Sequence, residues 1–403
     1  MTGRTHMTAS THAAMGDRLF VDGTFPGFRR ADGGVGVRNL IAVIPSVICA
    51  NVVTERIAAQ VPGAVAIPHP HGCAQVGDDV PLTERILAGV GANPNVGAVL
   101  VVGLGCETCQ SGDVASLVRR LAPGKPVESF SIQEAGGSIK SITRGVEVAR
   151  DLHASIADAI RVPVGLDELV VATQCGETDV STDTVANPAI GAVADDVVGA
   201  GGTVLLGETP EWMEIAAELA ARARDAATGG RLHQVVADYR RGAMAIGASV
   251  IGPEGDDDVV AGHVTARARA LGCVAKGGTA PIGEVLDFGA RPTRRGLAVM
   301  DTPAHDVVSI TAMAAAGAQV CLFATGRGTP VGSALMPVIK VTGNPRTASR
   351  MADNVDLAFD GTDRGTHARA LRNALASVVA GGEVVAEVIG QHDFAIHRVA
   401  PTV

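Results

Sequence analysis

Aromatic side chains are scarce in this chain of 403 residues, because Phe, Tyr and Trp together make up 2% of it. Proteins that read nucleic-acid bases rely on aromatic stacking, and a net charge of -9 at pH 7 disfavours a polyanionic partner. No stretch reaches the ~18 consecutive apolar residues of a membrane span. Residues 1–20 also lack the apolar core of a signal peptide. We therefore expect a cytoplasmic protein that binds neither nucleic acid nor a membrane.

Lysine is also rare, and the chain contains only Lys125, Lys140, Lys276 and Lys340. Lys276 and Lys340 lie beside apolar runs, where burial favours the neutral amine that can act as a base. A structural, salt-bridged lysine is an equally good interpretation. The 7 cysteines are scattered and odd in number, which indicates a reducing compartment. In that setting cysteines serve as metal ligands, nucleophiles or core residues.

Apolar runs that alternate with helical patterns predict the fold class. The clearest strand is VGAVLVVG at 96–103, and further strands are expected at 40–45, 65–68, 127–131, 169–172, 203–206 and 319–324. Strands that are apolar throughout belong to parallel sheets covered on both faces. We predict an α/β protein of two Rossmann-like units, with mainly parallel sheets and helices on both faces.

The predicted organisation has three parts. Residues 1–19 are expected to form a disordered tail, 20–162 a first α/β domain, and 163–403 a second α/β domain with an inserted loop near 252–262. Within the first domain, 20–34 is expected to be irregular. Within the second, 211–227 is expected to form one long Ala-rich helix.

The polar stretch ATQCGETDVSTDTVANPAIG at 172–191 follows a predicted strand and precedes a predicted helix. In α/β proteins this arrangement presents ligand-binding groups at the carboxyl edge of the sheet. Cys175, Glu177 and Asp179 are therefore candidate site residues. A cap of the following turn or helix by Asp179 is the structural alternative.

Two further loops carry possible metal ligands. His69, His71 and Cys73 follow one predicted strand, and imidazole and thiolate groups at this spacing suit Fe or Zn. Cys106 and Glu107 follow the strongest strand, and we expect one ligand from this loop. A loop with one buried cysteine is the alternative for the first, and a redox pair or a zinc site formed with Cys109 is the alternative for the second.

The turn Thr325-Gly326-Arg327-Gly328 follows another strand. Backbone N–H groups and a guanidinium in such a turn can hold a carboxylate or a phosphate. No GK[ST] sequence follows, so this is not a Walker loop.

Taken together, these segments resemble the altronate/galactarate dehydratase family of sugar-acid hydro-lyases. The resemblance rests on FRRADGGVGVRN (28–39), PSVICAN (45–51), HGC (71–73), NPNVGAVLVVGLGCE (93–107), IQEAGG (132–137), CGETD with TVANPAIG (175–191), GGTVLLGETPE (201–211), LGCVAKGG (271–278), GLAVMDTP (296–303) and FATGRGTPVG with PVIKVTGN (323–344). Each motif is weak alone, but they span nearly the whole chain in order.

The resemblance implies dehydration of a 2,3-dihydroxy carboxylate to a 2-keto-3-deoxy acid with Fe²⁺ as cofactor. Another divalent metal such as Mn²⁺ is an alternative, and so is an iron–sulfur cluster, since three thiolates from three loops could hold one. A carbon–sulfur lyase that releases sulfite from a sulfolactate-like acid is the first functional alternative. A non-catalytic subunit that binds a sugar acid is the second.

Two departures from the family pattern matter. Full-length family members carry a small N-terminal domain, which two-subunit relatives supply as a separate chain. Only about twenty residues precede the first unit here, so we predict a small partner subunit; self-association of the large chain is compatible with the sequence. The family also has CGGSD where this chain has CGETD, which introduces Glu177, and Ala268 and Arg269 replace acidic and lysine positions before LGC.

The predicted site draws on all of these loops. The metal ligands are expected among Cys73, Cys106, Cys175, Glu107 and Asp179, together with His71. The substrate is expected to contact Arg327, Gly326, Gly328, Asn187 and Glu177. Lys276 or Lys340 is the candidate base, and His71 is a candidate acid if it is not a ligand.

Overall fold

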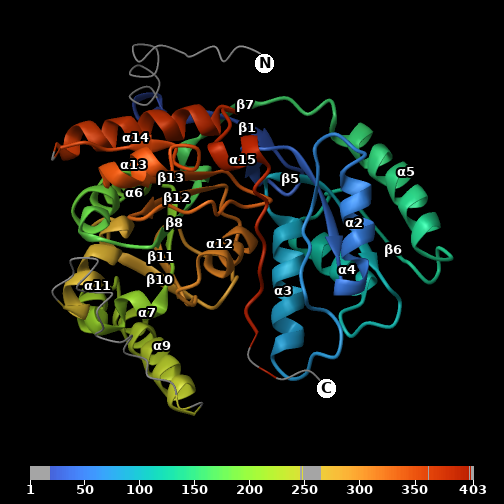
Figure 1. The fold of residues 1–403 in the computed structure, drawn as a ribbon, viewed down its shortest axis with the longest axis horizontal. Coiled ribbons are helices and arrows are strands. Elements are labelled where there is room, and N and C mark those ends of the chain that lie inside the picture. The colour runs from blue at the N-terminus through green and yellow to red at the C-terminus, as the bar shows by residue number, and fades with distance from the viewer. Residues whose placement is uncertain (1–18, 246, 248–264, 362, 399, 401–403) are drawn as a thin grey trace.

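The computed structural model describes residues 19–245, 247, 265–361, 363–398 and 400. The predicted loop near 252–262 and residues 1–18 of the predicted tail lie outside this part of the chain. Its strands form two parallel sheets and one small antiparallel sheet. Helices cover both faces of each parallel sheet (Figure 1). The predicted α/β class is confirmed.

The first parallel sheet has four strands in the order β4-β3-β5-β6. These are β3 (Leu40–Pro45), β4 (Ala64–Ala66), β5 (Val96–Gly103) and β6 (Val127–Ser131). The helices α2 (Asn51–Ala58) and α5 (Ser138–Ile156) pack on one face, and α3 (Asp79–Ala92) and α4 (Ser111–Leu121) on the other. The strand order reverses between β3 and β5, and ligands bind at such a point in open α/β sheets.

The second parallel sheet has seven strands in the order β10-β11-β9-β8-β12-β13-β14. They are β8 (Val170–Gly176), β9 (Thr203–Leu206), β10 (Ile282–Leu286), β11 (Gly296–Met300), β12 (Val320–Thr325), β13 (Val338–Thr342) and β14 (Leu357–Ala358). The helices α6 (Asn187–Gly199) and α14 (Arg364–Val379) cover one face, and α12 (Asp306–Ala315) covers the other. Here the order reverses between β8 and β12, so their loops flank the expected ligand crevice.

Two local expectations were wrong. Part of 20–34 forms the strand β1 (Thr24–Arg29), which pairs antiparallel with β2 (Val35–Gly36) and β7 (Val162–Gly165). The expected long helix at 211–227 is broken into α7 (Thr209–Trp212), a 3-10 turn and α8 (Ala216–Ala221), before α9 (Ala226–Ala245) begins. Buried Trp212 and Met213 interrupt the Ala-rich pattern at the break, so packing against the core overrides helix propensity there.

Three further described helices are α11 (Ala266–Val274), α13 (Pro345–Arg350) and α15 (Val385–Ile389). Among the described residues, no helix is both long and apolar enough to cross a membrane.

The two parallel sheets share an interface formed by α3 and α12, which Figure 1 shows side by side. A Cβ atom at Gly89 of α3 would lie 2.7 Å from the Ala315 carbonyl of α12, so glycine permits this close approach. Two buried side chains just after α3 also cross the interface. Asn93 Nδ2 donates to the Ala314 and Ala318 carbonyls at 2.7 and 2.9 Å.

Asn95 makes the more extensive connection. Its Nδ2 donates to the carbonyls of Gln319 and Leu335, at 2.9 and 3.0 Å, and its Oδ1 accepts from the Val37 amide at 2.8 Å. The side chain is fully buried. Because buried amides and carbonyls are costly to leave without partners, this one residue fixes the first sheet against the start of β12.

We expect Asn95→Leu to lower the free energy of unfolding by about 2–4 kcal/mol, because it leaves several buried backbone groups without partners. Urea unfolding followed by circular dichroism measures this loss. The matched control is Gln60→Leu, which removes an exposed side-chain amide and is expected to change stability by less than about 0.5 kcal/mol. Equal losses in the two variants would contradict the proposed role of Asn95.

Candidate functional site

Two cysteines meet at the carboxyl edge of the second sheet. Cys175 stands near the end of β8, and Cys273 lies in the last turn of α11. Their sulfur atoms are 3.4 Å apart, and both side chains are buried. Both remain free thiols. β8 is a central parallel strand, and its residues are buried almost throughout. Cys175 is therefore buried although it lies close to the end of the strand.

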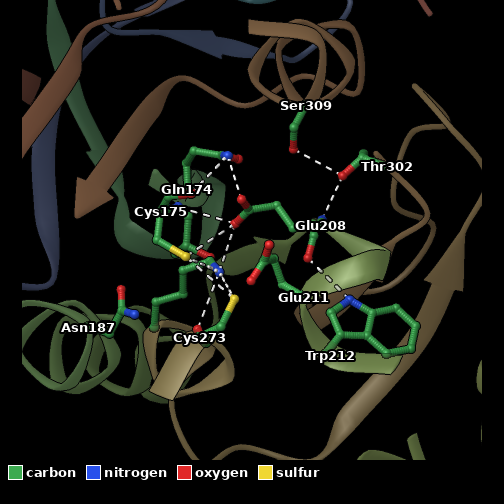
Figure 2. Close-up of polar contacts among 12 residues, drawn as sticks. Gln174, Cys175, Asn187, Glu208, Glu211, Trp212, Cys273, Thr302 and Ser309 are labelled. Atoms are coloured by element: carbon green, nitrogen blue, oxygen red, sulfur yellow. Dashed lines mark hydrogen bonds and ion pairs between the residues drawn. The ribbon is translucent and has the colours of Figure 1, made fainter. Parts of the chain in front are cut away.

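Lys276 brings a positive charge to this pair. Its Nζ lies 2.7 Å from Cys273 Sγ, 3.1 Å from Cys175 Sγ and 2.8 Å from a Glu208 carboxylate oxygen. Lys276 has no exposed side-chain area. The spacing from Cys273 to Lys276 is one helical turn, which places both side chains on the same side of the chain. Figure 2 shows Cys175, Cys273 and Glu208 converging from three segments.

Glu208 occupies an uncommon backbone conformation. Its φ is +67°, in the left-handed region that costs a non-glycine residue roughly 1–2 kcal/mol. Its amide donates to Thr302 Oγ1 at 2.6 Å, and its Oε1 accepts from Gln174 Nε2 at 2.7 Å (Figure 2). At the preceding Gly207, a Cβ atom would lie 2.8 Å from Thr302 Oγ1. The turn therefore holds the carboxylate in place at the expense of backbone strain, which is common at functional sites.

Burial and charge shift the titration of these groups. Burial opposes the charge on Lys276, but the two thiols and Glu208 outweigh it and hold the pKa of Lys276 well above its ordinary value. The hydrogen bond with Cys273, with burial second, raises the pKa of Cys175. Burial raises the pKa of Glu208 to about 7 despite the neighbouring Lys276. The site thus contains a protonated amine paired with a carboxyl group that titrates near neutrality.

A cavity of about 340 Å³ opens onto this cluster. Besides Cys175 and Glu208, its lining includes Glu177, His305 and Asp306. Asp306 accepts from Gln174 Nε2 at 2.9 Å, and burial raises its pKa. His305 Nδ1 accepts from the Val308 amide and caps α12. This hydrogen bond leaves the other ring nitrogen, Nε2, to carry the proton in the neutral imidazole.

The predicted loops after β8 and β12 pack together beside the cavity. The amides of Gly326 and Arg327 both donate to the Glu177 carbonyl at 3.1 Å. The Gly328 amide donates to Thr325 Oγ1 at 2.9 Å. These backbone donors are therefore engaged within the protein, and the guanidinium of Arg327 is the group of this turn that remains for a substrate. It lies 3.7 Å from the Glu177 carboxylate, and both side chains are about half exposed.

Asp179 has the surroundings of a cap. Its Oδ1 accepts from Ser181 Oγ and from the amide of Thr182, and its Oδ2 accepts from Asn344 Nδ2 at 2.7 Å. Burial opposes ionisation, but these hydrogen bonds outweigh it and lower the pKa of Asp179. Both carboxylate oxygens are occupied by protein donors. A metal-ligand role for Asp179 stays a prediction.

The other predicted metal ligands lie on loops of the first sheet. Glu107 is buried, and its carboxylate accepts from Ser46 Oγ and from the amides of Leu104 and Gly105. His71 is buried with Nε2 3.1 Å from the Ile396 carbonyl. Cys73 and Cys106 are exposed. These side chains come from loops that meet at Gly72, whose carbonyl accepts from the Thr108 amide, and the Cys175 cluster is built on the other sheet.

Two further predicted residues support the second sheet. Lys340 is buried in β13, and its Nζ donates to the carbonyls of Pro330 and Val331 at 3.0 and 2.9 Å. Asn187 begins α6, and its Nδ2 donates to the Gly272 carbonyl at 3.0 Å, while its buried Oδ1 has no hydrogen-bond partner. Asn187 thus joins α6 to the turn of α11 that carries Cys273.

Five residues of this site did not emerge from the sequence: Cys273, Glu208, His305, Asp306 and Gln174. Cys273 and Glu208 lie within the recognised segments LGCVAKGG and GGTVLLGETPE. Their roles were missed because they lie 65 positions from each other, and because Glu208 and Cys273 lie 33 and 98 positions from Cys175. The available signal for Cys273 was its position three residues, or about one helical turn, before Lys276, a lysine beside an apolar run.

The fold and this cluster define an α/β protein with a buried thiol, carboxylate and ammonium site at a sheet edge. Residues 166–402 match the model for the C-terminal domain of D-galactarate/altronate dehydratases, and residues 27–157 match the second domain of D-galactarate dehydratase/altronate hydrolase. The chain belongs to this family, as its sequence motifs predicted.

Curated relatives agree with this assignment. The chain is 34% identical over 349 residues to the (2R)-sulfolactate sulfo-lyase subunit beta of Chromohalobacter salexigens, covering 85% of this chain and 87% of that one. It is 31% identical to the altronate dehydratase of Bacillus subtilis, covering 80% of this chain and 66% of the relative. It is 33% identical to the galactarate dehydratase (L-threo-forming) of Escherichia coli, covering 83% and 67%. The relatives' names are those of lyases that act on sugar acids or a sulfonated acid.

We expect Glu208 to make the protein less stable as pH rises from about 4.5 to 7. Over this range the unfolded chain releases the Glu208 proton, whereas the folded protein, with its pKa raised to about 7, retains it. In Glu208→Gln this side chain cannot ionise. The fall in the free energy of unfolding between these pH values should therefore be smaller than in wild type by on the order of 2–3 kcal/mol.

Urea unfolding at pH 5.0 and pH 7.5 measures this effect, with Glu147→Gln on the exposed face of α5 as the control. A pH dependence that is the same in wild type and Glu208→Gln would show that Glu208 ionises at its ordinary pKa.

Proposed function

We propose that this chain is the catalytic subunit of a lyase that removes water from a small 2,3-dihydroxy carboxylate to give a 2-keto-3-deoxy acid. The observation that carries the proposal is the 340 Å³ cavity at the β8 edge, where a buried ammonium, two thiols and acidic groups converge. Membership of a dehydratase family supports the same reaction class.

The chemical difficulty is the C2 proton, which is only weakly acidic beside a carboxylate. Asp306 is the base that we propose, because it lines the cavity and because burial raises its pKa toward that of a useful proton acceptor. Gln174 Nε2 holds Asp306 in position. Lys276 is a poorer base than the sequence suggested, since its raised pKa keeps it protonated. Its ammonium instead stabilises negative charge that develops nearby.

The 3-hydroxyl group needs a proton to leave as water. His305 is the acid that we propose, because its Nδ1 accepts from the Val308 amide and its Nε2 therefore carries the proton. Arg327 is the proposed partner of the substrate carboxylate, with an exposed guanidinium on the turn after β12. Lys340 stabilises the segment that follows Arg327, because its Nζ donates to the carbonyls of Pro330 and Val331.

A divalent metal, Fe²⁺ first and Mn²⁺ as an alternative, is the cofactor that we propose. The donor chemistry of this cluster fits, because Cys175, Glu208 and Cys273 are all buried and offer ligand atoms within 4.8 Å of one another. When bound, the metal would supply Lewis acidity to the substrate carboxylate. The cluster contains two cysteines, fewer than the three thiolates expected for an iron–sulfur centre.

A sulfite-releasing lyase is the second candidate. The chain is 34% identical to a (2R)-sulfolactate sulfo-lyase subunit beta, a relative named as one subunit of a sulfo-lyase. The same comparison supports the proposal that a separate small subunit completes the enzyme. Activity is therefore best assayed on protein isolated anaerobically from its own cells, so that any such subunit is retained.

We expect the isolated enzyme to form 2-keto acids from members of a panel of aldonates and aldarates, detected as semicarbazones. Asp306→Asn and His305→Gln should each lower kcat by about 10²–10⁴-fold, because each removes a proton-transfer group. Glu147→Gln on α5 is the control and should retain full activity. Sulfite release from 3-sulfolactate without any 2-keto-3-deoxy acid would favour the second candidate, and undiminished turnover by Asp306→Asn would refute the proposed base.

We expect Cys273→Ser to retain less than about a tenth of the metal bound by wild type after anaerobic loading with Co²⁺. Thiolate-to-cobalt absorption bands and elemental analysis report binding independently of activity. Cys73→Ser removes an exposed cysteine of the first sheet and serves as the matched control, with full metal content expected. Loss of metal from Cys73→Ser but not from Cys273→Ser would move the metal site to the loops of the first sheet.

A further inference from the structure

Glu177 lines the cavity and has an unusual backbone conformation. Its φ is +49°, so a non-glycine residue adopts the left-handed conformation at this point. Its carbonyl is fixed by the amides of Gly326 and Arg327, at 3.1 Å each. The backbone is thus locked to the turn after β12, and the side chain is directed to the Arg327 guanidinium. A strained backbone that is fixed by its neighbours is a common feature of functional positions.

The Glu177–Arg327 pair is loose. The closest nitrogen and oxygen atoms are 3.7 Å apart, beyond hydrogen-bonding distance. Both side chains are about half exposed, so water screens their attraction. A substrate carboxylate, which can form a bidentate pair with a guanidinium, can therefore replace Glu177 on Arg327.

Of the three cations compared in this region, one has a partner that a substrate anion can displace. Lys276 is paired with Glu208 at 2.8 Å, and Arg269 lies 3.5 Å from Glu211, which also lines the cavity. Asp306 adds a further acidic group to the lining. Arg327 is the cation whose partner is most easily displaced. Once a substrate carboxylate takes Arg327, the Glu177 carboxylate remains close by without its counter-ion.

We propose that Glu177 determines substrate charge and restricts the enzyme to monocarboxylic polyhydroxy acids. A second carboxylate or a sulfonate on the substrate would face Glu177, and like charges at close range weaken binding. Neutral hydroxyl groups meet no such penalty and can donate hydrogen bonds to the carboxylate. The inference rests on the proposed function, narrows its substrate class to aldonates, and speaks against a dianionic sulfonate as substrate.

The test compares Glu177→Gln with wild type, and uses Glu147→Gln on α5 as a control that removes a distant exposed charge. Calorimetry measures Kd for an aldonate and for the aldarate with the same carbon skeleton, and turnover assays measure kcat/KM for both. Wild type and control are expected to favour the aldonate. In Glu177→Gln, the ratio of the two affinities is expected to shift toward the aldarate by about tenfold, the effect of removing one nearby like charge.

The shift should fade at high ionic strength, because both charges are exposed to solvent. An unchanged aldonate-to-aldarate ratio in Glu177→Gln, or a wild-type preference for the dianion, would overturn the inference. Charge-selective binding that responds to Glu177→Gln but comes without 2-keto acid formation would refute the proposed reaction and leave the role of Glu177 standing. If the enzyme forms 2-keto acids but the aldonate-to-aldarate ratio is the same in wild type and Glu177→Gln, only the role of Glu177 is refuted.

Discussion

The arrangement at the carboxyl edge of the second sheet depends on one buried positive charge. The Lys276 ammonium has no exposed area, and a charge without partners in such surroundings is strongly destabilising. Its surroundings are arranged accordingly. Glu208 adopts a strained conformation to reach it, Gln174 and Thr302 hold Glu208, and Cys175 and Cys273 arrive from β8 and α11. Cys175 and Glu208 also line the cavity, so two of the groups that surround the buried ammonium help to shape the site.

The first sheet acts on this site from a distance. Asn93 and Asn95 reach from the end of α3 to carbonyl groups at the end of α12, the start of β12 and the segment before β13. These contacts fix α12, whose first turn contains Asp306 and is capped by His305. The loops with His71 and Glu107 are organised separately, by hydrogen bonds to Ile396 and Ser46. The position of the proposed acid and base is therefore set jointly by both sheets.

Much of the fold could be predicted because apolar strands of the interior are distinct in sequence. The strands at 40–45, 96–103, 127–131 and 203–206 were predicted with the bounds observed. Four strands of the second sheet, β10, β11, β13 and β14, were not predicted as strands, since their motifs contain Gly and charged residues beside short apolar runs. The small antiparallel sheet also escaped, because the pairing of Thr24–Arg29 with Val162–Gly165 joins segments more than 130 positions apart.

The site was predictable only in part, for a related reason. Cys175, Glu177, Arg327 and Lys276 follow strands or lie in conspicuous glycine-rich segments, and the structure places them around or beside one cavity. Glu208 is an ordinary residue in its local sequence, and Cys273 is marked only by its position three residues before Lys276. What distinguishes them is proximity to Lys276, which depends on how the chain returns to the same sheet edge and leaves no local periodic pattern.

The central place of β8 has a consequence for how the protein is made. β8 pairs on one side with β9, which follows closely, and on the other with β12, where Val171 lies opposite Val320. About 150 residues separate Val171 from Val320, and at roughly 5–20 residues per second the ribosome needs about 8–30 s to synthesise the intervening chain. Throughout that interval an apolar strand has an open hydrogen-bonding edge. Among the interior strands of this sheet, the strand that carries Cys175 therefore waits longest for its second neighbour.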